Sequence, residues 1–445
     1  MFKVAWLIPI LAFPIGGSLF YLLFGRSHLN KKNAQKLQKT IDSSDGTIIK
    51  NLRLIEEIKR ENGHVSREVE YLTTVARSDV YQNTETKFLS PGSVFFEELV
   101  LELEKAEEFV FLEYFIVGEG SMWSRIHGIL LEKLRLGVDV RLIYDDFGSI
   151  STVPPNFAEK LRAEGFKVAA FNMFKPSLDK FMNYRDHRKL TIIDNKVAFT
   201  GGINIADEYI NQKERFGFWS DSSVKVKGDA VVKNTVLFLE MWYFTTGELP
   251  DYQKYLKKYS ASSDGYVIPF ADEPLLSESI SENAYVNVIN NARSYIYICT
   301  PYLILDNVIA SALINAAKSG VKVVIITPHT PDKKLVFMLT RANYKELVCA
   351  GVEIYEFTPG FMHTKMIISD GSTAIVGTSN FDYRSFYMHF ENGIWMHGSA
   401  AVQEAKESFE KIKSISERIT KEFCENVSMG TRLGRSLLNL FSPLL

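Results

Sequence analysis

Two stretches of the sequence decide the fold, and they resemble each other: DHRKLTIIDNKVAFTGGIN at residues 186–204 and MHTKMIISDGSTAIVGTSN at residues 362–380. Each contains histidine, lysine and aspartate in the pattern H-x-K-x4-D. In each, a glycine follows the aspartate by seven positions, and an asparagine follows the histidine by seventeen. A pattern this specific, present twice at equivalent places, indicates an internal duplication.

The segments before these two stretches repeat as well. The apolar runs at 108–118 and 294–306 are each followed by a helical pattern that ends at a glycine, Gly137 or Gly320, and then by another apolar run. Glycine commonly ends helices, and strands that alternate with helices predict an α/β fold. We therefore expect two similar α/β sandwich halves with mixed sheets, packed about a pseudo-two-fold axis with a site between them.

Length and hydropathy predict the organisation of the chain. With 445 residues the chain is longer than a single core usually grows. The run from Val4 to Phe24 is uncharged and long enough to span a bilayer, although Pro9 and Pro14 would kink it, so that a re-entrant segment stays open. The expected segments are an N-terminal membrane segment (1–25), a linker and helical region packed loosely on the body (26–87), a first half (88–260), a second half (261–425) and an amphipathic tail (426–445).

Charge and composition exclude several classes of protein. The formal net charge is −2, which disfavours a general nucleic-acid binder. Three cysteines and eight histidines show neither a disulfide framework nor zinc-ligand spacing, so we expect no metal and no cofactor. Lysines and arginines lie mostly after the N-terminal run, and this predicts that the body of the protein is cytoplasmic.

The histidines and lysines of the two stretches suit phosphate chemistry. Residues two apart on a strand point to the same face, so His187 projects with Lys189, and His363 with Lys365. An unpaired ammonium group is costly to bury, so two lysines in apolar strands need an anion. One histidine could then attack phosphorus while the other acts as an acid.

The remaining polar residues of the pattern are expected to support this site. Asp194 and Asp370 fall at turns, because their spacing from the histidines has the opposite parity. Small residues, among them Ser379, allow close backbone approach before Asn204 and Asn380, whose amides could donate hydrogen bonds to a phosphate.

The sequence as a whole resembles a known family. The duplicated motif and its surroundings are similar to the phospholipase D superfamily, and within it to the bacterial cardiolipin synthases. The likeness covers nearly the whole chain, and it is carried by YRDHRKLTIIDNKVAFTGGINIADEY (184–209), FGFWSD (216–221), TPYLILD (300–306), PGFMHTKMIISD (359–370), VGTSNFDYRSF (376–386) and RSLLNLFSPLL (435–445).

The resemblance implies a phosphatidyltransferase of the bacterial cell membrane that uses neither metal nor cofactor. Two phosphatidylglycerol molecules would give cardiolipin and glycerol through a phosphohistidine. Family habit suggests His187 as the nucleophile and His363 as the acid, although the residues alone leave that assignment open. Its partners would be phosphatidylglycerol and membrane lipids, and the oligomeric state is left unassigned.

The resemblance also implies two carboxylates that orient the imidazoles. These are Asp221 for His187, with Glu214 as a competitor, and Glu391 for His363. Asp194 and Asp370 would then brace the site. His389 is interpreted as structural, although the family more often has asparagine there.

Three alternatives remain open. A hydrolytic phospholipase D, or another transphosphatidylase of the same fold, would use water or a different alcohol as the acceptor. A nuclease would share the motif, but the membrane run and the net charge argue against it. A catalytically inactive membrane scaffold would have no use for two intact sets of histidine, lysine and asparagine.

Overall fold

The computed structural model describes residues 7, 10–11, 13–21, 31–173, 180–262 and 265–440. The expected membrane run at 4–24 falls only partly within them, and the end of the expected tail, 441–445, lies outside. Helix α2 (Pro14–Phe20) belongs to that run. Within the described ranges, no helix combines the length and apolar character needed to cross a bilayer.

The first sheet has seven strands in the order β1-β9-β7-β6-β2-β3-β4. Strands β2, β3 and β4 are parallel, and the other pairings are antiparallel, so the sheet is mixed as expected. Its strands are β1 (Thr84–Leu89), β2 (Phe109–Tyr114), β3 (Asp139–Asp145), β4 (Lys167–Phe171), β6 (Lys189–Ile193), β7 (Val197–Gly201) and β9 (Ser223–Gly228).

The second sheet repeats this order as β10-β17-β16-β15-β11-β12-β13 and adds β18 at its edge. Its parallel and antiparallel pairings follow those of the first sheet. The prediction of an α/β fold with two similar halves is confirmed. Its strands are β10 (Tyr266–Asp272), β11 (Tyr295–Cys299), β12 (Lys322–Pro328), β13 (Glu353–Phe357), β15 (Met366–Ser369), β16 (Thr373–Gly377), β17 (His389–His397) and β18 (Ser416–Ile419).

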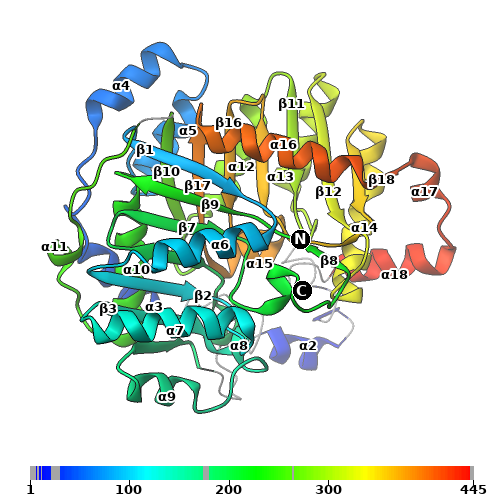
Figure 1. The fold of residues 1–445 in the computed structure, drawn as a ribbon. Helices are drawn as coiled ribbons and strands as arrows, with labels where there is room; N and C mark the ends of the chain where they lie inside the picture. Colours follow the sequence, from blue (N-terminus) through cyan, green and yellow to red (C-terminus); the bar gives the residue numbers. More distant parts are fainter. Residues whose placement is uncertain are drawn as a thin grey trace.

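Helices cover both faces of each sheet (Figure 1). The outer face of the first sheet packs on α6 (Gly92–Leu103), α7 (Ser121–Arg135) and α9 (Phe157–Ala163), and that of the second on α12 (Ile280–Asn291), α13 (Asn307–Lys318) and α14 (Lys334–Cys349). Two helices, α10 (Val231–Thr246) and α16 (Ala400–Ser414), lie on the inner faces. The remaining helices after β1 are α8 (Asp146–Ser149), η2 (Lys180–Asn183), η3 (Asp207–Ile210), α11 (Tyr252–Tyr255), α15 (Tyr383–Tyr387), α17 (Lys421–Glu425) and α18 (Met429–Leu440).

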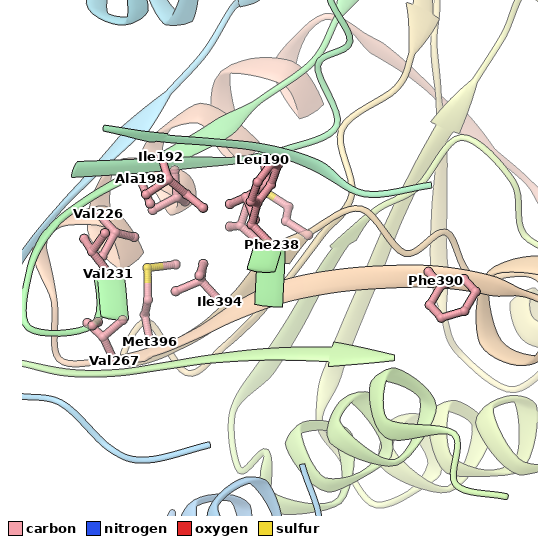
Figure 2. Close-up of a cluster of buried hydrophobic side chains, with 14 of the residues drawn as sticks. Leu190, Ile192, Ala198, Val226, Val231, Phe238, Val267, Phe390, Ile394 and Met396 are labelled. Atoms are coloured by element: carbon pink, nitrogen blue, oxygen red, sulfur yellow. The ribbon is translucent and has the colours of Figure 1, made fainter. Parts of the chain in front are cut away.

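One hydrophobic core joins the two halves. Figure 2 shows side chains of β6 and β7, such as Leu190 and Ala198, beside Phe238 of α10 and Ile394 and Met396 of β17. All five are at most 1% exposed. Because this core is shared, the two sheets are held in one fixed arrangement, which a site built from both halves requires.

The helices before β1 pack more tightly than the sequence suggested. They are α3 (Lys31–Asp42), α4 (Leu52–Glu61) and α5 (Ser66–Thr74). Glu68 of α5 is 3% exposed, and its carboxylate accepts hydrogen bonds from Trp395 Nε1 at 2.6 Å and Asn291 Nδ2 at 2.7 Å. The expectation of loose packing was wrong, because an amphipathic helix that buries a hydrogen-bonded carboxyl group is tied to the second half.

Glu68→Ala is expected to lower the free energy of unfolding by about 1–3 kcal/mol, because it leaves the buried Trp395 N–H without an acceptor. Denaturant unfolding measures this change. The matched control is Glu70→Ala on the same helix, where the exposed carboxylate makes surface contacts with Lys59 and Thr74 and a change within about 0.5 kcal/mol is expected. Equal effects of the two substitutions would contradict the role given to Glu68.

Candidate active site

Both histidine–lysine pairs of the repeat are buried side by side, as their strand spacing predicts. His187 and His363 are 8% and 9% exposed, and the two lysines at most 1%. Lys189 Nζ donates to the carbonyl oxygen of His187 at 2.5 Å, and Lys365 Nζ donates to that of His363 at 2.5 Å. The two pairs share one site, since the charge of Lys189 acts on both Lys365 and His363.

Two short parallel strand pairings bring the halves together at this site. β5 (Arg185–Asp186) pairs with the start of β17, so that Asp186 lies opposite Phe390. β14 (Gly360–Met362) pairs with β8 (Phe218–Ser220), so that Met362 lies opposite Ser220. In both cases a histidine is the next residue of one strand and a carboxylic acid the next residue of the other.

The carboxylates therefore pair with the histidines crosswise between the halves. His187 Nδ1 lies 2.9 and 3.0 Å from the two carboxylate oxygens of Glu391, and His363 Nδ1 lies 2.7 Å from Asp221 Oδ2. The sequence identified both carboxylates, but the predicted pairing of Asp221 with His187 and of Glu391 with His363 was wrong. The competitor Glu214 is exposed, whereas Asp221 is fully buried.

This geometry fixes the state of each imidazole. A carboxylate at Nδ1 favours the tautomer with the proton on Nδ1, and it leaves the lone pair on Nε2. The backbone adds a second constraint, because the N–H of His187 donates to Phe390 O at 2.9 Å and that of His363 to Ser220 O at 2.7 Å. The site thus presents two oriented Nε2 atoms that can act as nucleophile, base or, once protonated, acid.

Burial shifts the protonation equilibria of the cationic groups in one direction. It lowers the pKa of His187 and of His363 well below the usual range, and the neighbouring lysines add to the effect. It also lowers the pKa of Lys189 to about 7 and that of Lys365 to about 8. A bound anion would reverse these shifts, because it favours the charged forms.

The two carboxylates differ in their acidity. Burial raises the pKa of Asp221 to about 7, against the opposing charge of Lys365. Burial also acts to raise the pKa of Glu391, but its hydrogen-bonded pairing with His187, together with His389 at 3.6 Å, outweighs it and holds that pKa well below its usual range. The imidazole of His187 thus has the more strongly ionised carboxylate beside it.

The aspartates of the motif lie away from this chemistry. Asp194 accepts hydrogen bonds from the backbone N–H groups of residues 107–109 at 2.8–2.9 Å, and Asp370 does the same for residues 293–295. Both sit in left-handed turns, with φ of 54° and 53°. Each aspartate fixes the start of a central strand, β2 or β11 (Tyr295–Cys299), where the turn after β6 or β15 crosses it, which is a bracing role of the kind expected from the sequence.

The other expected supporting residues are buried, and two of them make contacts within the protein. Asn204 Oδ1 accepts from the N–H of Ile116 at 2.9 Å, and its Nδ2 donates to Tyr209 at 2.7 Å. Ser379 Oγ donates to Ser281 Oγ at 3.0 Å. The Oδ1 atom of Asn380 is buried without a hydrogen-bond partner, so of these three Asn380 retains an unused polar atom.

His389 is the residue that the sequence interpretation missed. Its Nδ1 lies 3.6 Å from Glu391 Oε1, and its ring centroid lies 5.4 Å from that of His187. Strand parity could have found it, because residues 389 and 391 of β17 share a face. Among the described residues, His187, His389 and Glu391 form the one group whose ligand atoms, all within 4.8 Å of one another, could hold a metal ion.

Asp370→Ala is expected to lower the free energy of unfolding by about 1.5–3 kcal/mol, because three backbone N–H groups lose a charged acceptor. The folded variant should retain its turnover, whereas His363→Ala should not. Thermal unfolding and a turnover assay on the same preparation check this. A large loss of turnover at unchanged stability would place Asp370 in the chemistry after all.

Comparison with known proteins gives one consistent result. The family described as "Cardiolipin synthase, PLD-like domain" matches residues 99–234 and 285–413. A cardiolipin synthase of Alkalihalophilus pseudofirmus is 35% identical over 446 residues, covering 99% of this chain and 88% of the relative. A Streptococcus mutans protein named only as uncharacterized is 41% identical, covering 99% of this chain and 96% of its own.

A solved structure supports the fold independently. The phosphatidylserine synthase of Haemophilus influenzae superimposes with a TM-score of 0.62 at 14% identity, covering 81% of this chain and 93% of that one. At that identity the likeness concerns the fold alone. The full-length similarity and the family match, however, cover both halves of the site, and on that basis the chain belongs to the cardiolipin synthase family, whose members carry a phospholipase D-like domain.

Proposed function

We propose that this protein is a cardiolipin synthase that transfers a phosphatidyl group from one phosphatidylglycerol to another, with release of glycerol. The observation that carries the proposal is the crosswise site: two imidazoles with free Nε2 atoms and two buried lysines, assembled from both halves. A phosphodiester is an anion that two ammonium groups can hold between two imidazoles.

In the first half-reaction His187 Nε2 attacks phosphorus. A P–N bond forms, the bond from phosphorus to the glycerol oxygen breaks, and His363, protonated once the anion is bound, gives its proton to the departing glycerol. The assignment of His187 as the nucleophile follows family resemblance. It also fits the electrostatics, because the more strongly ionised Glu391 lies beside His187 and stabilises the positive charge that the ring gains on phosphorylation.

In the second half-reaction a hydroxyl group of another phosphatidylglycerol attacks the phosphohistidine. The neutral His363 removes the hydroxyl proton as a new P–O bond forms and the P–N bond breaks, which restores both histidines. Lys189 and Lys365 neutralise the phosphate oxygens in both transition states, and loss of either would cost about 10²–10³ in rate.

Phosphatidylglycerol is a membrane lipid, so the enzyme would work at a bilayer. We propose that residues 1–25 attach it to the bacterial cell membrane, with the catalytic halves on the cytoplasmic side. The uncharged run at 4–24, followed by basic residues, supports this placement.

Incubation of the enzyme with labelled phosphatidylglycerol alone tests the proposal. Cardiolipin and free glycerol are expected in equal amounts, and the His187→Ala and His363→Ala variants should form neither. If the phosphohistidine of the wild-type enzyme is trapped and the protein is digested, the label should be found on His187. The label should be released in acid. Phosphatidic acid as the main product would instead identify a hydrolytic phospholipase, and no turnover in a well-folded preparation would favour a scaffold.

The pH dependence of kcat and kcat/KM should report the protonation of the two lysines. A lysine is charged below its pKa, so the free enzyme loses positive charge as pH rises through about 7 and about 8. We expect kcat/KM to fall as pH rises above about 7, and more steeply above about 8, while kcat falls at higher pH, because the bound phosphate keeps the lysines charged. Steady-state kinetics across the pH range measures both, and a kcat/KM that stays level well above pH 8 would contradict the assigned role.

A further inference from the structure

A cleft of about 730 Å³ opens beside the histidines. Phe115 and His389 line it, and both rings pack against His187, with centroid distances of 5.0 and 5.4 Å. Lys334, at the start of α14, and Tyr302 line the same cleft. The volume is in the range of small-molecule sites, so the cleft can hold part of a substrate next to the reacting atoms.

The charge of this cleft is positive on the α14 side. Lys333 and Lys334 line it, both are exposed, and neither forms an ion pair with any described residue. Lys333 Nζ lies 5.5 Å from the centroid of the Tyr302 ring. Arg185, Arg384 and Asp382 line the cleft as well, and Arg185 is bound by Asp145 at 2.8 Å. Lys333 and Lys334 are thus two cations of this cleft that form no ion pair with a described residue.

The proposed reaction creates a need for a second anion site. The acceptor phosphatidylglycerol has its own phosphodiester, and this group cannot occupy the place of the phosphate held between the two histidines. In the product the two phosphates are joined through one glycerol, so the second phosphate must lie one glycerol away. Lys333 is placed for this role, because it lines the same cleft as His389, whose ring centroid lies 5.4 Å from that of His187.

We propose that Lys333 and Lys334 bind the phosphodiester of the acceptor phosphatidylglycerol and thereby select a phospholipid over water as the acceptor. This inference rests on the proposed synthase reaction. Leu335 and Val336 follow the two lysines and line the same wall, where they give the lipid portion of the acceptor an apolar surface. The site between the histidines holds the phosphate that reacts, and the α14 site holds the phosphate that does not.

A competition between two acceptors tests this assignment. Labelled phosphatidylglycerol in neutral-detergent micelles is incubated with ethanol, so that the phosphohistidine is captured either by a second phosphatidylglycerol or by an alcohol without a phosphate. The ratio of cardiolipin to phosphatidylethanol then reports acceptor choice alone, because both products come from the same intermediate.

In Lys333→Met and Lys334→Met this ratio is expected to fall about tenfold, the size of a lost charge-assisted contact. Lys345→Met, which removes an exposed lysine from the same helix outside the cleft, should leave it at the wild-type value. An unchanged ratio in both cleft variants would overturn the inference while the synthase reaction stands. If the wild-type enzyme makes phosphatidylethanol but no cardiolipin, the proposed function itself fails, and this inference fails with it.

Discussion

The site depends on the hydrogen bonds that cross from each histidine to a carboxylate of the other half. His187 is held by Glu391 and His363 by Asp221, so each of these two imidazole–carboxylate pairs is completed only by the other half. Each pair stands directly after a short parallel strand pairing between the halves. The shared hydrophobic core and these two strand pairings therefore have a joint effect: they fix both imidazoles relative to each other, which a reaction with two histidines requires.

Burial shifts the pKa values of the groups in this site, and it also makes their charged forms costly. Two lysines that are at most 1% exposed repel each other and have their pKa values lowered, so the protein alone does not favour their charged forms. An anionic phosphodiester relieves that repulsion and raises the pKa values of the nearby groups, so that an imidazole can take up a proton from solvent where an acid is needed. The substrate thus supplies part of the negative charge that the two buried lysines need and that the protein does not provide.

The repeated motif combines two physical roles in one short segment. Histidine and lysine share a strand face at the site, whereas the aspartate at the turn binds three backbone N–H groups at the other end of the strand. The motif is compact because the strand that carries the histidine and the lysine ends at the turn whose aspartate anchors it. The opposite parity of the aspartates already placed them at turns, but spacing alone did not show that each carboxylate binds three backbone N–H groups.

The sequence by itself determined the duplication, the α/β class and the shared face of each histidine and lysine, because strand parity and helix ends are local properties of the chain. The two orienting carboxylates were identified through the family resemblance of the sequence and not through its periodicity. Only the tertiary structure decided which carboxylate faces which histidine, that His389 joins the site and that a positive cleft opens beside it. The paired residues are 204 and 142 positions apart, and they meet through pairings of two and three residues. No local periodicity specifies such a register, because it is fixed by how the two sheets pack.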